Sequence, residues 1–173
     1  MPELIPVLDK ETILRKVDEV ARQISSDYCD SDLVIIGVLK GAFIFMADLV
    51  RRLDIRRFSI DFVRLASYGS ASASSGKISL LKDIETDIRG KDVLIIEDIL
   101  DTGRTLNFLH QHIAASAPRS IETCVLIEKS ERRATEVHVK YICHKVQSGF
   151  LVGYGLDFDE TYRNLPAIFN LKF

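Results

Sequence analysis

The chain has 173 residues, of which 47% are hydrophobic and 28% charged, with 9 Gly, 4 Pro and 3 Cys. This length predicts a single domain over residues 1–173, and the high apolar content excludes a largely disordered chain. The formal net charge of −2 disfavours a broad nucleic-acid-binding surface, so any phosphate site must be local.

The cysteines, the first residues and the apolar runs bear on where the protein resides and on whether it spans a membrane. Three cysteines with no Cys-x-x-Cys spacing favour buried thiols in a reducing compartment over a zinc cluster or a disulfide framework. The first residues, MPELIPVLDK, lack the basic start and apolar stretch of a signal peptide. The longest apolar runs, 33–39 and 41–47, fall short of the roughly 18 residues that a membrane span needs. The sequence therefore predicts a cytoplasmic protein that does not bind membranes.

The first predicted element is an amphipathic helix over 10–27, where apolar residues recur at helical spacing. Strands then alternate with helices along most of the remaining chain. The predicted strands are 33–39, 58–65, 92–98, 121–129, 137–146 and 150–156, and the two further helices are 42–53 and 103–116. Three of the strands are unbroken apolar runs, as expected where both faces of a sheet are covered. The predicted fold class is α/β with a mainly parallel sheet.

The segment 69–77, GSASASSGK, interrupts this alternation with small and polar residues. Its composition alone favours a surface linker. The alternative is a mobile lid over an active site, because long loops inside compact domains are often functional.

The stretch VLIIEDILDTGRTL, at 93–106, carries the most chemical information. Four apolar residues lead into Glu97 and Asp98, and a third carboxylate, Asp101, follows. Burying these charges is costly unless a cation, ligand hydroxyls or water compensates them. The residues that come next are Thr102, Gly103, Arg104 and Thr105. Backbone amides, hydroxyls and a glycine at the start of a helix form a phosphate cradle, whereas an isolated Asp-Thr-Gly would favour simple helix capping.

This stretch resembles the phosphoribosyl pyrophosphate (PRPP) signature of type I phosphoribosyltransferases. Three other segments resemble the hypoxanthine-guanine branch of that family: GVLKGAFIFMADL (37–49), SYG with the serine-rich loop (67–76), and FLVGYGLDFDETYRNLP (150–166). Their order and spacing match over nearly the whole chain. The resemblance implies the type I phosphoribosyltransferase fold, in which helices flank a mainly parallel sheet and a small hood and a flexible lid loop cover the active site.

The resemblance also implies an activity, that of a pentosyltransferase in purine salvage. The 5-phosphoribosyl group of PRPP would pass to N9 of hypoxanthine or guanine, giving IMP or GMP and pyrophosphate. Mg²⁺ is the implied cofactor, a homodimer or homotetramer the implied assembly, and nucleic acid is not expected to bind. Two alternatives stay open: a nucleotide-sensing regulator of the same fold that binds RNA or DNA, and an enzyme that prefers xanthine or another base. The presence of Asp101, Lys129 and Asp157 favours the enzyme.

Within 93–106, the resemblance implies a role for each polar residue. Glu97 and Asp98 would hold the ribose hydroxyls of PRPP, partly through Mg²⁺, and the residues from Thr102 to Thr105 would bind the 5′-phosphate. Asp101 would accept or share the proton on purine N7 as N9 attacks C1′. A carboxylate at the mouth of a phosphate cradle suits both proton acceptance and stabilisation of a cationic ribose, and the sequence leaves both open.

Residues for the pyrophosphate follow from the same resemblance. Lys40 interrupts an apolar stretch, and such lysines commonly extend to the surface. The resemblance instead assigns Lys40 and Gly41 to pyrophosphate and implies a cis peptide bond at Leu39–Lys40. Arg163 and Arg133 would neutralise the leaving pyrophosphate.

Residues for the purine follow the later strands. Lys129 would donate to purine O6, although a solvated lysine at a strand end is the simpler alternative. Phe150 would stack on the purine, Leu151 would offer main-chain contacts, and Asp157 would ligate a second Mg²⁺. Without the resemblance, Phe150 would be interpreted as a core residue.

Ser67 and Tyr68 match the start of the family's catalytic lid, which favours a lid over a linker at 69–77. Lid closure would exclude water from the reactive ribosyl centre.

The sequence departs from the family at two places. Ser148 stands where an Asp is usual, which bears on the position of the purine-side loop and on base preference. Lys129 is followed by Ser130-Glu131-Arg132-Arg133 without the proline often found there, which bears on the alignment of Arg133.

Overall fold

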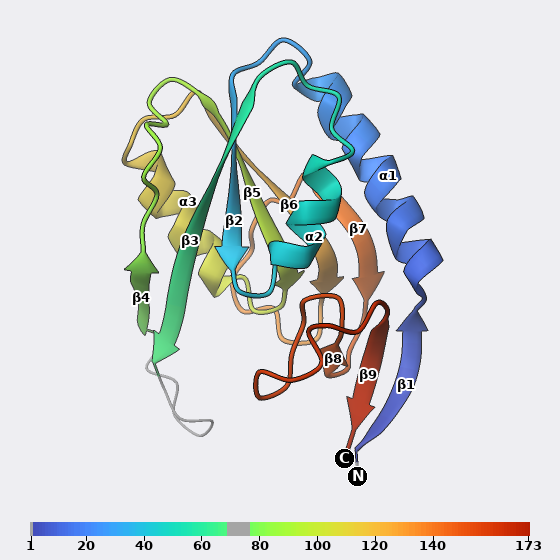
Figure 1. The fold of residues 1–173 in the computed structure, drawn as a ribbon. Coiled ribbons are helices and arrows are strands. Elements are labelled where there is room, and N and C mark those ends of the chain that lie inside the picture. The colour runs from blue at the N-terminus through green and yellow to red at the C-terminus, as the bar shows by residue number, and fades with distance from the viewer. Residues whose placement is uncertain (1, 69–76) are drawn as a thin grey trace.

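A six-stranded sheet with the strand order β4-β3-β2-β5-β6-β7 forms the centre of the computed structural model, which describes residues 2–68 and 77–173 (Figure 1). Five of its strands run parallel, and β4 pairs antiparallel with β3 at one edge. The strands are β2 (Leu33–Leu39), β3 (Phe58–Tyr68), β4 (Lys77–Lys82), β5 (Asp92–Leu100), β6 (Ser120–Lys129) and β7 (Tyr141–Val146). The predicted α/β class with a mainly parallel sheet is confirmed.

Helices cover both faces of this sheet. In Figure 1, α1 (Lys10–Asp27) and α2 (Phe43–Val50) lie on one face and α3 (Arg104–Ala114) lies on the other. The crossover from β2 through α2 to β3 runs one way along the sheet, and the crossover from β5 through α3 to β6 runs the opposite way. Because such crossovers are right-handed, opposite directions place their helices on opposite faces.

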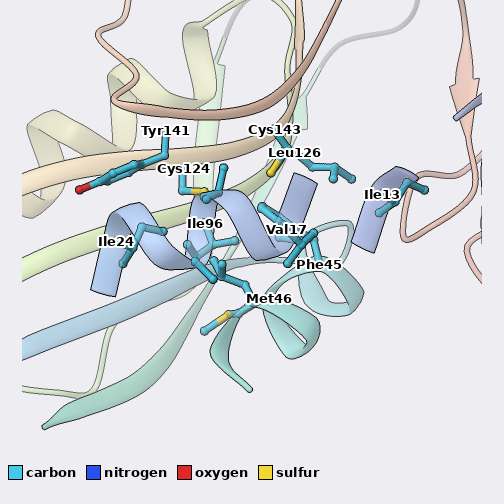
Figure 2. Close-up of a cluster of buried hydrophobic side chains, with 14 of the residues drawn as sticks. Ile13, Val17, Ile24, Phe45, Met46, Ile96, Cys124, Leu126, Tyr141 and Cys143 are labelled. Atoms are coloured by element: carbon cyan, nitrogen blue, oxygen red, sulfur yellow. The ribbon is translucent and has the colours of Figure 1, made fainter. Parts of the chain in front are cut away.

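The two faces contain two separate hydrophobic cores. Alternate residues of β5 point to different faces, so Leu94 and Ile96 belong to the core under α1 and α2, while Val93 and Ile95 belong to the core under α3. Figure 2 shows the first core, where Val17 of α1 and Phe45 of α2 meet the sheet. This two-sided burial explains why β2 and β5 are continuous apolar runs.

The start of α1 is fixed by a side-chain cap. Asp9 Oδ1 accepts a hydrogen bond of 2.7 Å from Thr12 N, and this bond lowers the pKa of the Asp9 carboxyl. The observed bounds of α1 agree with the helix predicted over 10–27.

A second, three-stranded antiparallel sheet has the order β1-β9-β8. Its strands are β1 (Glu3–Leu8), β8 (Leu151–Val152) and β9 (Ile168–Lys172). In Figure 1 it lies beyond the carboxyl ends of the parallel strands, the position expected for the predicted hood. Neither β1 nor β9 was predicted from the sequence.

The predicted strand over 150–156 is wrong beyond its first residues. The strand β8 ends at Val152, and Gly153 and Gly155 follow with φ of +98° and +101°. A Cβ at Gly153 would overlap the carbonyl oxygen of Ala167, so the backbone turns here and packs against the segment before β9.

Several other boundaries differ from the prediction. The helix α2 ends at Val50 rather than 53, and β7 begins at Tyr141 rather than 137. The strands β3 and β5 continue beyond their apolar runs, to Tyr68 and Leu100. The predicted lid at 69–77 lies outside the described residues except for Lys77, where β4 begins. None of the described helices is both long and apolar enough to span a bilayer.

Candidate active site

A cavity of about 330 Å³ opens at the carboxyl ends of β2 and β5. These strands are neighbours whose following connections leave in opposite directions, which is where open parallel sheets bind ligands. Its wall includes most of the residues predicted for PRPP and pyrophosphate, namely Gly41, Glu97, Asp98, Asp101, Thr102, Gly103, Thr105, Asp157 and Arg163. The fold therefore brings three separate segments of the chain to one site.

Two glycines allow the close backbone contacts of this site. A Cβ at Gly41 would overlap the carboxylate of Asp98, so the loop after β2 lies directly against the end of β5. Gly103 has a φ of +84° and would overlap the carbonyl oxygen of Thr135 if it carried a Cβ. Position 103 therefore requires glycine, whereas a side chain at position 41 would displace the Asp98 carboxylate.

The acid pair at the end of β5 is electrostatically unfavourable without a counter-charge. Glu97 is only 7% exposed, and this burial raises its pKa well above the ordinary value, with the neighbouring charge of Asp98 adding to the rise. Burial also raises the pKa of Asp98, whose Oδ1 accepts a 2.8 Å hydrogen bond from Ile99 N. Such a pair suits a hard cation, because Mg²⁺ prefers oxygen ligands.

Asp101 has one anchored oxygen and one without a partner. Its Oδ2 lies 3.5 Å from Lys129 Nζ and 3.7 Å from Arg132 Nη1. Its Oδ1 is buried and, within the described part of the chain, has no hydrogen-bond partner. An unpaired buried oxygen on a cavity wall is costly, so it is a ready acceptor for an N–H or O–H of a ligand.

The predicted phosphate cradle is the turn between β5 and α3. The carbonyl oxygen of Thr102 accepts hydrogen bonds from Ala134 N at 2.9 Å and Thr135 N at 3.0 Å, which fix the turn from outside. The first amides of α3 begin at Arg104, and helix N-termini favour anions through such amides and the helix dipole. The side chain of Arg104 is exposed and does not line the cavity.

The predicted pyrophosphate residues meet in an ion-pair cluster. The peptide bond Leu39–Lys40 is cis, as the resemblance implied. Lys40 Nζ lies 2.7 Å from Glu160 Oε2, and Arg163 Nη2 lies 3.3 Å from Glu160 Oε1 and 2.9 Å from Asp157 Oδ1. Glu160 thus joins both cations, although it is not among the residues predicted from the sequence. Its Glu-x-x-Arg spacing to Arg163 was the available signal.

Lys129, predicted for the purine side, is a buried lysine rather than a solvated one. It ends β6 with 7% exposure, and its Nζ donates to Gly149 O at 3.2 Å in addition to its contact with Asp101. Phe150, the residue after Gly149, is 46% exposed, and Leu151 is buried in β8. These residues do not line the cavity, but Lys129 connects them to its wall through Asp101.

Arg133 and the lid residues stand apart from the cavity wall. Arg133 Nε donates to Asp101 O at 3.0 Å, and Nη2 donates to Lys129 O at 3.1 Å. Arg133 therefore braces the backbone of two other predicted site residues. Ser67 and Tyr68 lie at the end of β3, and their side chains are outside the described part of the structure.

The donor set fits Mg²⁺ shared with a substrate. The carboxylates of Glu97, Asp98 and Asp157 share the cavity wall. Among the described residues, no three His, Cys, Asp or Glu side chains converge closely enough to hold a metal by themselves. Mg²⁺ is typically held by one or two carboxylates together with substrate phosphates, which agrees with this arrangement.

Comparison with known proteins gives a consistent result. The family described as "Phosphoribosyl transferase domain" matches residues 6–159. Two similar proteins are the hypoxanthine-guanine phosphoribosyltransferases of Aquifex aeolicus, 44% identical over 96% of this chain and 93% of that protein, and of Dictyostelium discoideum, 45% identical over 96% and 94%. A crystal structure of a hypoxanthine phosphoribosyltransferase from Staphylococcus aureus superposes with a TM-score of 0.92 at 41% identity, covering 96% of this chain and 90% of that one.

Proposed function

The chain belongs to the phosphoribosyltransferase family, and from that premise we propose that it transfers the 5-phosphoribosyl group of PRPP to N9 of hypoxanthine or guanine. The products are IMP or GMP and pyrophosphate, so the reaction is one of purine salvage. The observation that carries the proposal is the cavity in which the acid pair Glu97 and Asp98 adjoins the helix-terminal cradle of α3.

PRPP binds along the wall of this cavity. The turn from Thr102 to Thr105 holds the 5′-phosphate through amides at the start of α3 and the threonine hydroxyls. Glu97 and Asp98 hold the ribose hydroxyls and Mg²⁺, and Asp157 holds a second Mg²⁺. Bound Mg²⁺ supplies positive charge that stabilises the departing pyrophosphate.

Lys40 and Arg163 neutralise the pyrophosphate as the bond between C1′ and its oxygen breaks. Both cations contact Glu160 in the structure, so pyrophosphate replaces this carboxylate as their partner. Stabilising the leaving group matters because the ribosyl carbon becomes cationic as the bond breaks.

Asp101 acts at the purine. Its unpaired Oδ1 accepts or shares the N7 proton while N9 forms the new bond to C1′. Lys129 holds the other oxygen of Asp101 at 3.5 Å and donates to purine O6. A donor at this position favours a 6-oxopurine over adenine, because the amino group of adenine donates rather than accepts.

The decisive experiment is a base panel with the purified protein, PRPP and Mg²⁺. We expect pyrophosphate release with hypoxanthine or guanine and little release with adenine. The Asp101→Asn variant is the matched control for background turnover. Absence of turnover with every 6-oxopurine would contradict the proposal, and turnover with xanthine alone would reassign the base.

We further propose that residues 1–173 form one cooperative domain and that the protein assembles as a homodimer or homotetramer. Calorimetry should give a single unfolding transition, and light scattering coupled to gel filtration should give two or four chains per particle. A monomer at assay concentrations would contradict the assembly.

A further inference from the structure

Both backbone groups of Phe150 are held by β9. Phe150 N donates to Asn170 Oδ1 at 3.0 Å, and Leu171 N donates to Phe150 O at 2.7 Å. Figure 1 shows β8, which begins just after Phe150, beside β9, and Leu151 is the register partner of Asn170. Because a backbone N–H can only donate, the Asn170 atom that faces it must be the carbonyl oxygen.

The loop before Phe150 closely fits the Asn170 side chain. Gly149 has a φ of +118°, and a Cβ there would lie 3.0 Å from Asn170 Oδ1. The half-buried side chain of Asn170 thus lies against the loop at two successive residues.

The ring of Phe150 is restrained as well. Its ring centroid lies 5.6 Å from that of Phe158 and 6.5 Å from that of Phe173, and both pairs are in edge contact. Phe150 thus has contacts through both its backbone and its ring, although 46% of its surface is exposed. Such prior restraint lowers the entropy that a flat ligand must overcome on stacking.

The loop before Phe150 carries no carboxylate two residues from the Phe150 amide. Position 148 holds an exposed Ser. The carboxylate of an Asp at 148 could accept from the amide two residues on, which is that of Phe150. Here Asn170 occupies that acceptor role from across the sheet.

We propose that Asn170 is a positioning residue that orients Phe150 for stacking on the purine. This inference rests on the proposed function, because Phe150 matters to catalysis only if a purine stacks on it. Asn170 thereby contributes to purine affinity without contacting PRPP.

The first test compares Michaelis constants. In Asn170→Ala, the KM for hypoxanthine should rise about fivefold, the factor expected for one lost hydrogen bond, while the KM for PRPP stays within about twofold. Asn170→Asp keeps the acceptor and should stay near wild type. Adding Ser148→Asp to Asn170→Ala should restore most of the purine affinity. Lys172→Ala, on the same face of β9 two residues away, is the matched control and should change neither constant.

A second readout does not depend on activity. Hydrogen exchange of the Phe150 amide should be faster in Asn170→Ala and slow again in Asn170→Asp and in the double variant. If Asn170→Ala fails to fold, Asn170→Leu, which keeps the number and branching of side-chain atoms but removes the acceptor, takes its place. Unchanged exchange or an unchanged KM for hypoxanthine would overturn the inference. An inactive wild type would instead overturn the proposed function, while the exchange result would still report on the hydrogen bond.

Discussion

The two ends of β5 carry carboxyl residues that expose equally little surface but are in opposite electrostatic states. Asp92, at the first residue, is 6% exposed, and Glu97, near the other end, is 7% exposed. Asp92 accepts hydrogen bonds from Arg119, whose Nε lies 2.9 Å away, and from Ser120 Oγ at 2.6 Å. The bond from Arg119 outweighs burial and lowers the pKa of Asp92 to about 2, whereas burial raises the pKa of Glu97. Hydrogen-bond partners and the depth of burial together decide the state of each carboxyl.

This difference separates stability from function along one strand. The satisfied carboxylate at the amino end stabilises the fold, because its charge is compensated wherever the chain is folded. The acid pair at the carboxyl end costs stability as long as its charges lack a counter-charge. A residue that lowers stability in the free protein, and lies in a cavity, is a better functional candidate than one that is fully paired.

The largest expected effect lies at the functional end, at Asp101 just beyond β5. Asp101→Asn should lower kcat by about 100-fold or more, because an amide oxygen is a far weaker proton acceptor than a carboxylate. Steady-state kinetics measures kcat, and calorimetric titration measures PRPP affinity. Asp30→Asn, an exposed carboxylate away from the cavity, is the control. A collapse of PRPP affinity with kcat preserved would make Asp101 chiefly a binding residue.

The next effect lies at the structural end and should spare activity. Asp92→Ala leaves Arg119 and Ser120 without their acceptor, and we expect the free energy of unfolding to fall by about 3 kcal/mol. Thermal unfolding should show a Tm lower by about 6–12 °C for a chain of this size. At 25 °C the kcat and both KM values should match the wild type. Loss of activity in the folded variant would show that the two ends of β5 are not independent.

Strands with a local sequence pattern could be predicted, and strands that depend on distant partners could not. The strands β2 and β5 were predictable because burial on both faces leaves a continuous apolar run. The strands β1 and β9 were not, because each is short and is stabilised by pairing with a segment far away in the chain. The glycines at 153 and 155 interrupt an apolar segment that otherwise has the pattern of a strand.

The residues of the candidate site also divide into those that are close together in the chain and those that only the fold brings together. Glu97 through Thr105 were selected because their chemistry is consecutive in the chain. Asn170 could not be, because its partner Phe150 lies 20 residues away and only the fold brings the two together. Glu160 has a local partner in Arg163, but its contact with Lys40, 120 residues away, also depends on the fold. Arg133 was selected by resemblance for pyrophosphate, but its contacts to backbone oxygens depend on how β6 and the β5–α3 turn pack.

A smaller effect is the acid sensitivity that Asp92 confers. Its folded pKa of about 2 lies below the ordinary value of 3.8, so its contribution to stability is complete above pH 3.8 and is lost as the pH falls toward 2. The difference in unfolding free energy between wild type and Asp92→Asn should therefore be constant near neutral pH and shrink by about 2 kcal/mol between pH 4.5 and 2. Urea unfolding at several pH values measures it. Asp61, whose pKa is also about 2, is present in both proteins and cancels. A difference that grows on acidification would contradict the assignment.

The smallest effect has the opposite sign and lies at the acid pair. Asp98→Asn removes one charge beside Glu97, so the free protein should gain about 1 kcal/mol of stability, or about 2–4 °C in Tm. The same change removes a proposed Mg²⁺ and ribose ligand, so the Tm increase that Mg²⁺ and PRPP give together should be smaller than in wild type. Thermal unfolding with and without both ligands measures the two effects on one sample. Asp98 is half-buried and also accepts from Ile99 N, a bond that the Asn carbonyl oxygen can keep, so the substitution tests charge rather than shape. A less stable free protein would mean that the pair is already compensated, and the two ends of β5 would then be alike.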